Sequence, residues 1–174
     1  VIAADMQVGT TSGDLYTRGG VPLSSLRLLS GARVAVLELA MNHAGESRDL
    51  CAIARQRIGV VTNVGHAHME AFDSIQAVAA AKRELIEALP ADGIAVLNAD
   101  DPLVLEFRKA HPGRTITFGL GEAADVRAED VEFSSAGVKF SVRGARFVSP
   151  PLGPPSTLNL LAGIRGCGLF DTRP

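Results

Sequence analysis

Two side chains of this sequence, Glu38 and His68, have the chemistry and the expected placement to bind a divalent cation. Glu38 lies near the end of the apolar run RVAVLELA, and His68 lies in a polar turn that follows the β-branched run GVVT. Open α/β sheets bind ligands beyond the carboxyl ends of their strands, so both side chains are expected at one edge of a sheet. Hard cations such as Mg²⁺ favour oxygen ligands with an occasional imidazole, and no zinc motif is present.

Each candidate residue also has a simpler interpretation when it is taken alone. Glu38 could form a local salt bridge or lie in water at a strand end, and His68 could be an ordinary core or surface histidine. Lys82 lies among alanines in a helical pattern and could be a solvated helix residue. Asp100 and Asp101 would by default cap the helix that follows them. The residues by themselves leave these alternatives open.

The elements that must position these side chains follow from hydrophobic periodicity. Apolar runs bounded by turn residues predict buried strands, and apolar residues at helical spacing predict helices between them. This alternation is typical of an α/β fold with a mostly parallel sheet flanked by helices. The expected strands cover residues 33–40, 59–62, 93–97 and 114–118, and the expected helices cover 21–29, 46–56, 74–89 and 102–110.

The remaining segments complete a single domain that covers residues 1–174. Residues 1–20 are expected to be irregular, because they are rich in Gly, Thr and Ser and show no periodicity. The α/β core covers 21–120, and period-two alternation on both sides of a turn predicts a C-terminal antiparallel β-hairpin over 121–148. Residues 149–174 are expected to form a proline-rich connector and a short helix weakened by glycines.

Composition excludes several classes of protein. The 174 residues are 47% hydrophobic and 21% charged, as in ordinary globular domains, and the net charge of −2 gives no electrostatic support for a nucleic-acid partner. No apolar run approaches the ~20 residues of a membrane span. Cys51 and Cys167 each lie in an apolar context, so we expect no disulfide and a cytoplasmic location.

Three segments, in this order, resemble the central domain of the Mur ligase family: AVLELAMNHAGE, VVTNVGHAHMEAFDSIQAVAAAKRELI and GIAVLNADDP. The similarity extends from about Gly20 to about Leu161 and is most specific from Asn63 to Lys82. The motifs NHAGE and HMEAFDS resemble most the branch that adds D-alanyl-D-alanine to UDP-N-acetylmuramoyl-tripeptide in peptidoglycan synthesis. A ligase domain of the folylpolyglutamate or cyanophycin type is the alternative within the same superfamily. The resemblance implies a P-loop NTPase-like fold and an ATP-dependent amide ligation that proceeds through an acyl phosphate.

The resemblance also implies roles for particular residues. Glu38 and His68 correspond to ligands of Mg²⁺, and Lys82 corresponds to a lysine that the family carbamylates to support a metal. These three residues would therefore be catalytic as well as metal-binding. A lysine that is partly desolvated among alanines is easier to deprotonate and hence to carbamylate.

Further matches concern the nucleotide and the substrate. Asn159 in TLNLLAGI matches an asparagine that contacts the adenine of ATP, and Asn42 and His43 lie in a segment on the presumed substrate side.

The sequence departs from the family at residues that bind the nucleotide. The family's phosphate-binding loop is expected before Val1, and VGTTSG cannot replace it because it lacks the lysine that meets the phosphates. A family asparagine appears as Arg18, and a His-Asn pair appears as Pro155-Ser156. We therefore expect this chain to be a truncated piece that by itself binds ATP weakly or not at all and does not ligate. The non-enzyme alternative is an interaction module that kept the fold.

The missing phosphate-loop strand has a structural consequence. That strand is usually central in P-loop folds, so its loss would leave unpaired edges inside the sheet. We therefore expect self-association or another partner chain at this gap, or a rearranged N-terminal segment.

Overall fold

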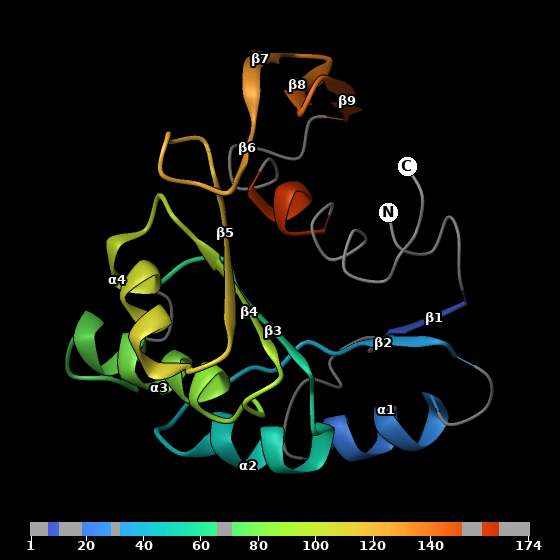
Figure 1. Cartoon of the computed structure of the whole chain (residues 1–174). Helices are drawn as coiled ribbons and strands as arrows, with labels where there is room; N and C mark the ends of the chain where they lie inside the picture. The colour runs from blue at the N-terminus through green and yellow to red at the C-terminus, as the bar shows by residue number, and fades with distance from the viewer. Residues whose placement is uncertain (1–6, 11–18, 29–31, 66–70, 151–157, 164–174) are drawn as a thin grey trace.

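The computed structural model describes residues 7–10, 19–28, 32–65, 71–150 and 158–163 (Figure 1). Strands and helices alternate through the first two thirds of the chain, as predicted, and further strands follow before a helical segment at residues 158–163. The elements are β1 (Val8–Thr10), α1 (Gly20–Leu28), β2 (Val34–Val36), α2 (Glu46–Ala54), β3 (Ile58–Val61), α3 (Ile75–Glu87), β4 (Ile94–Asn98), α4 (Pro102–Leu105), the 3₁₀ helix η2 (Glu106–Ala110), β5 (Arg114–Gly119), β6 (Val126–Arg127), β7 (Glu129–Ser134), β8 (Gly137–Val142) and β9 (Ala145–Ser149).

The centre of the molecule is a parallel sheet of four strands in the order β3-β4-β5-β6. Side chains alternate along β4, so that Val96 and Leu97 enter different hydrophobic clusters on its two faces. Leu97 packs with residues of α3, α4 and η2, among them Ile86 and Phe107. The sheet is therefore buried on both faces, as its nearly continuous apolar strands predict.

The other face of this sheet is covered by a second, antiparallel sheet in the order β7-β8-β9 and by a helical segment at residues 158–163. Phe118 of β5 and Phe140 of β8 share one cluster with Leu161 of that segment. The predicted hairpin is confirmed, with one addition: its last residues form a third strand, β9, which pairs with β8 and extends one residue into the expected connector. Strand β9 ends at Ser149, immediately before the prolines, which cannot donate ladder hydrogen bonds.

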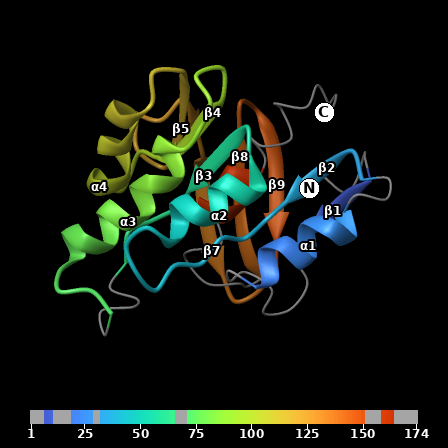
Figure 2. The same cartoon turned by 90° about the horizontal axis from the view of Figure 1, so that it is seen from below.

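Helix α3 is the longest of the described helices, and in the view from below it lies on the left of the molecule beside α4 (Figure 2). The Ser74 side chain caps it by accepting a hydrogen bond from the backbone N–H of Ala77. Its buried face includes Val78, Ala81 and Ile86, which matches the predicted helical period. No helix among the described residues is long and apolar enough to cross a membrane.

The N-terminal strands form a separate parallel pair, β1-β2, in which Val8 lies opposite Val34. Within the described part of the chain, no strand joins β2 to β3, so the parallel strands fall into two groups (Figure 1). Strand β1 lies inside the segment predicted to be irregular, because three residues are too short to show a period.

Two other predicted elements, residues 33–40 and 102–110, differ from the prediction. The strand expected over residues 33–40 is confined to Val34–Val36, so Glu38 lies beyond the strand and is exposed. Of the short helix expected within residues 149–174, the structure describes residues 158–163 as helical, and the rest of that segment lies outside the described residues. Helix 102–110 is present but tightens into a 3₁₀ turn from Glu106 onward.

Candidate functional site

The loop that leaves β3 is held by side chains from neighbouring elements. The Asn98 amide donates to the carbonyl oxygen of Thr62 at 2.8 Å, and Lys82 Nζ donates to the carbonyl oxygen of Asn63, also at 2.8 Å. The backbone N–H of Val64 donates to Asp101 Oδ2 at 2.7 Å. Three consecutive residues are therefore fixed at the carboxyl end of β3, shortly before His66 and His68 in the sequence.

Lys82 projects from α3 toward this carboxyl edge, where a ligand of an open α/β sheet is expected. Its side chain is half-buried, and burial lowers the pKa of its amine, while the nearby Asp101 carboxylate acts in the opposite direction. A lowered pKa increases the fraction of neutral amine, which is the form that attacks carbon dioxide. The Lys82 side chain is thus partly withdrawn from water while it remains partly exposed.

The two adjacent aspartates have different roles. Asp101 caps α4, because its Oδ1 accepts the backbone N–H groups of Leu103 and Val104. Asp100 does not cap the helix, which corrects the prediction for that residue: its carboxylate accepts the N–H groups of Leu120 and Gly121 in the loop after β5. Between them, the two carboxylates connect the ends of three neighbouring strands.

Glu38 lies on the segment that leaves β2. Three residues further on, Met41 is buried in a cluster with Val78 and Ala81 of α3. Ala81 immediately precedes Lys82, so the segment after Glu38 runs to the turn of α3 that carries the lysine. The hydrophobic cluster thus places the segment after Glu38 against the helix that carries Lys82.

Asn42 and His43 form an exposed loop between this cluster and α2. The Glu46 carboxylate folds back and accepts the backbone N–H groups of Asn42 and His43 at 2.7 and 3.2 Å. The His43 ring nitrogen Nδ1 lies 2.6 Å from the carbonyl oxygen of Asn42. The loop therefore has a defined backbone and presents its polar side chains to solvent, as a binding loop requires.

Glu84 is a buried residue of this region that the sequence interpretation did not single out. It is 8% exposed, and its carboxylate accepts the backbone N–H groups of Gly45 and Arg48 at the start of α2. A signal was present: Glu84 lies on the same helical stripe as Val78 and Ala81, and an acid on an inward face must be paired or hydrogen-bonded.

The other predicted residues have different outcomes. His68 lies outside the described residues, as do Arg18, Pro155 and Ser156. Asn159 is exposed on the segment 158–163, whose Leu161 and Ala162 face the core. Its side chain is therefore available to a ligand.

The donor groups allow a test of whether a metal ion fits. Among the described residues, no group of three His, Cys, Asp or Glu side chains is close enough to hold a metal ion. A site built from Glu38, His68 and Lys82 would draw one ligand from outside that part of the chain and another from a lysine. The exposed carboxylate of Glu38 and the half-buried amine of Lys82 fit such a set, because carbamylation converts the amine into an oxygen donor.

A hollow of about 350 Å³ lies elsewhere, between α3 and η2. Arg83, Glu106 and Lys109 line it, together with apolar residues such as Phe107. It lies on the flank of α3 that carries Arg83, and neither Lys82 nor the described residues 62–65 after β3 line it. The hollow is therefore separate from the described part of the candidate site.

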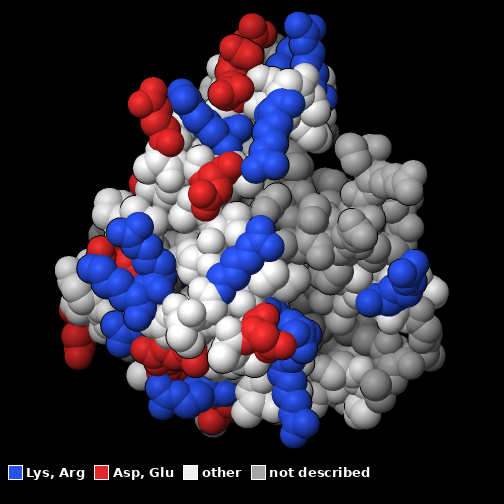
Figure 3. Space-filling view, in the orientation of Figure 1, with Lys and Arg blue, Asp and Glu red and all other residues white. Residues whose placement is uncertain are grey.

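The surface of the molecule carries charges of both signs. Figure 3 shows acidic and basic side chains interspersed over the face that it displays.

Comparison with known sequences gives one consistent result. Residues 3–165 match the Mur ligase middle domain. The UDP-N-acetylmuramoyl-tripeptide--D-alanyl-D-alanine ligase of Bacillus subtilis is 32% identical over 176 residues, a match that covers 100% of this chain and 38% of that protein. The ligase of the same name from Escherichia coli is 35% identical over 135 residues, covering 76% of this chain and 30% of that protein. The chain thus spans less than half of the relatives that it matches.

Solved structures agree with the sequences. MurF from Thermotoga maritima in complex with ADP superposes with a TM-score of 0.86 at 28% identity, covering 99% of this chain and 41% of that one. MurF from Acinetobacter baumannii superposes with a TM-score of 0.90 at 24% identity, covering 98% and 38%, a likeness that concerns the fold.

Proposed function

Because this chain belongs to the Mur ligase family through its middle domain, we propose that it is the nucleotide-binding part of an ATP-dependent ligase that joins D-alanyl-D-alanine to UDP-N-acetylmuramoyl-tripeptide. The relatives that it matches carry that name, and a solved structure with the same fold holds ADP. The observation that supports the proposal most directly is the placement of Lys82, half-buried and aimed at the carboxyl end of β3.

The proposed reaction joins a carboxylate to an amine in two steps. The substrate carboxylate attacks the γ-phosphorus of ATP, which forms an acyl phosphate and releases ADP. The amine then attacks the acyl carbon, phosphate leaves with the electrons of the broken C–O bond, and the amine loses a proton. The condensation thus consumes one ATP for each amide bond formed.

Particular residues of this chain would support these steps. We assign Glu38, His68 and carbamylated Lys82 as ligands of Mg²⁺, Asn159 as a contact to adenine, and Asn42 and His43 as contacts to the peptide substrate. When bound, Mg²⁺ would neutralise negative charge that develops on phosphate and acyl oxygens. The bonds that Asn98, Lys82 and Asp101 make would keep the backbone before His68 in place.

Titration calorimetry with ATP and Mg²⁺ tests the nucleotide site. We expect a dissociation constant in the millimolar range or weaker, which corresponds to a binding free energy of about −4 kcal/mol at most. The reason is that the phosphate-binding loop is not among the residues of this sequence. Asn159→Ala should weaken this binding further, whereas Arg143→Ala, which alters the β8–β9 turn, should leave it unchanged. If no nucleotide is bound at any accessible concentration, the non-catalytic interaction module is favoured. Micromolar binding would show that the site is retained in full.

Mass spectrometry tests the role of Lys82. Spectra recorded after equilibration with bicarbonate should show one added CO₂ on Lys82, and Lys82→Arg should remove it. Lys109 is an exposed control, because its amine is paired with Glu106 and is not desolvated. Carbamylation of Lys109 to the same extent would argue against a special reactivity of Lys82.

We also propose that copies of this chain associate through the gap between β2 and β3. Support comes from the split sheet and from the exposure of Val36 and Val60 on these strands, 44% and 40% respectively. Edge strands with free backbone groups pair readily with another chain. Sedimentation over a range of concentrations should show a dimer that Val60→Lys weakens. A monomer at every concentration would contradict this.

A further inference from the structure

Glu84 is a buried charge to which the proposed reaction assigns no step. It lies two residues after Lys82 on α3 and is 8% exposed. Its Oε1 accepts the Gly45 N–H at 2.8 Å, and its Oε2 accepts the Arg48 N–H at 3.3 Å. A carboxylate is costly to bury unless hydrogen bonds compensate for lost water, and these N–H groups provide them.

The partners of Glu84 are the free backbone groups at the start of another helix. Helix α2 begins after Gly45, which has a φ of 88° and offers no side chain as a cap. The first N–H groups of any helix need acceptors, and a negative charge at this end also interacts favourably with the helix dipole. Glu84 supplies both from 39 residues away, so the start of α2 takes its position from α3.

The same segment is attached to α3 on its other side. Met41 is buried against Val78 and Ala81 of α3. Between these two attachments, Glu46 closes the loop internally through the backbone N–H groups of Asn42 and His43. The exposed loop therefore has a rigid internal shape, and the helix that carries Lys82 determines where that shape lies.

From this geometry we propose that Glu84 is a positioning residue that holds the exposed Asn42–His43 loop in a fixed position relative to Lys82. The role of the loop in substrate contact rests on the proposed function, whereas the mechanical coupling does not. Glu84 acts through backbone amides and would touch neither substrate nor metal. Its loss should therefore alter substrate affinity while leaving nucleotide affinity unchanged.

Amide hydrogen exchange in Glu84→Gln tests the coupling. Gln keeps the shape but places an N–H₂ group against N–H donors, so Gly45 and Arg48 should exchange on the order of tenfold faster. Asn42 and His43, which Glu84 does not contact, should accelerate as well. Glu87→Gln is the matched control on the same helix, because Glu87 contacts the side chains of Arg83 and Arg48. Acceleration confined to Gly45 and Arg48 would reduce Glu84 to a local cap and overturn the proposal.

Two further measurements keep the test decisive. If Glu84→Gln does not fold, the wild-type protein in mild denaturant should show Asn42, His43, Gly45 and Arg48 opening together, and independent opening of the first two would overturn the proposal. In folded Glu84→Gln, calorimetry with UDP-N-acetylmuramoyl-tripeptide should show an affinity about tenfold weaker, with ATP affinity unchanged. If the wild type binds neither ligand, the proposed function fails, and the exchange data still decide the role of Glu84.

Discussion

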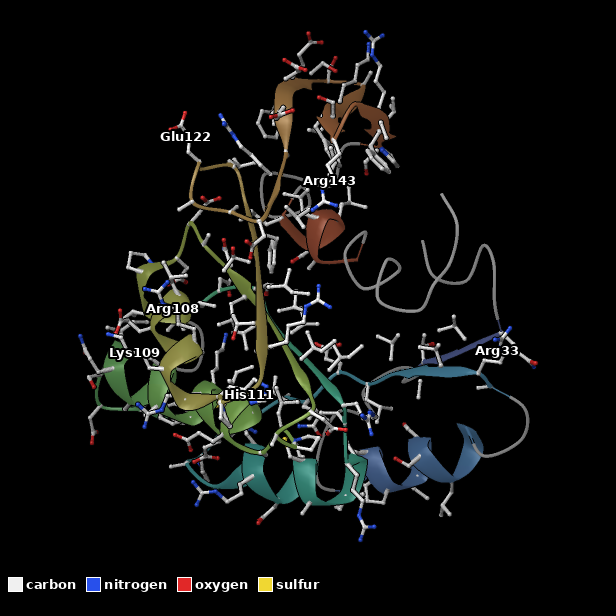
Figure 4. The ribbon with its side chains drawn as sticks, in the orientation of Figure 1. Arg33, Arg108, Lys109, His111, Glu122 and Arg143 are labelled. Carbon is white, nitrogen blue, oxygen red and sulfur yellow. The ribbon has the colours of Figure 1, made fainter. Side chains whose placement is uncertain are left out.

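The carboxyl end of β2 and the carboxyl ends of β3, β4 and β5 are supported in different ways. The loops after β3 and β5 are bonded directly to residues at the end of β4 and just after it, namely Asn98, Asp100 and Asp101. The segment after β2 is instead attached to α3, through Met41 and Glu84. In Figure 4, Arg33, which precedes β2, lies on the right of the molecule, and Arg108 and Lys109 of η2 lie on the left. The loops after β3 and β5 are therefore held from β4, which is paired with a strand on each side, whereas the segment after β2 depends on a helix.

The largest expected effect contrasts the cores of the two strand groups. Phe118 of β5 is fully buried, whereas Val36 of β2 is 44% exposed. Phe118→Ala should lower the free energy of unfolding by about 3–5 kcal/mol, and Val36→Ala by less than about 1 kcal/mol. Urea denaturation measures both. Similar losses would mean that the β1–β2 pair is as much a part of the core as the central sheet.

A second pair of variants compares the two adjacent carboxylates. Asp101→Ala removes a helix cap and leaves the Val64 N–H without its acceptor, so we expect the free energy of unfolding to fall by about 2 kcal/mol. Asp100→Ala should cost about 1 kcal/mol, because the Leu120 and Gly121 amides that it frees are exposed to water. Thermal or urea unfolding provides the comparison. A greater loss from Asp100→Ala would show that the loop after β5 matters more than the loop after β3.

The pH dependence of stability sharpens the comparison at Lys82. Burial lowers the pKa of this amine in the folded chain, so the unfolded chain binds the proton more tightly. At a pH below the folded-state pKa of Lys82, the charged amine lowers the free energy of unfolding. This destabilisation decreases as the pH rises toward the pKa of Lys82 in the unfolded chain. Relative to Lys82→Met, the wild type should gain stability toward alkaline pH, by less than about 1 kcal/mol because water screens a half-exposed charge. Urea denaturation at several pH values, in buffers free of CO₂, measures the difference in free energy of unfolding between the wild type and Lys82→Met. A difference that stays constant with pH would contradict the lowered pKa.

The smallest effect concerns the thiol of Cys51 on α2. Burial raises its pKa, the Glu84 carboxylate raises it further, and a hydrogen bond with Gln56 acts in the opposite direction. Alkylation with iodoacetamide should therefore be slower in the native protein than in urea, because only the thiolate reacts. Glu84→Gln should make native alkylation faster. Equal rates with and without urea would show that α2 does not stay packed against α3.

The sequence predicted much of the fold, because the signals involved are local. The apolar run at 93–97 became β4 (Ile94–Asn98), and the helix expected over 74–89 became α3 (Ile75–Glu87), capped by Ser74. Lys82 lies on that helix with its amine at the carboxyl end of β3. The short strands β1 and β9 were missed, because three to five residues beside glycines and prolines show no clear period.

Periodicity, capping and family resemblance thus determined which residues form the helices and strands and which residues are candidates for chemistry. Only the tertiary structure decided that Asp100 holds the loop after β5 while Asp101 caps α4, and that Glu84 binds the start of a helix 39 residues away. A carboxylate has the same local sequence signal whether its partner is a water molecule or a distant amide. Its partner is set by the packing of helices against the sheet, which brings together groups that are far apart in the chain.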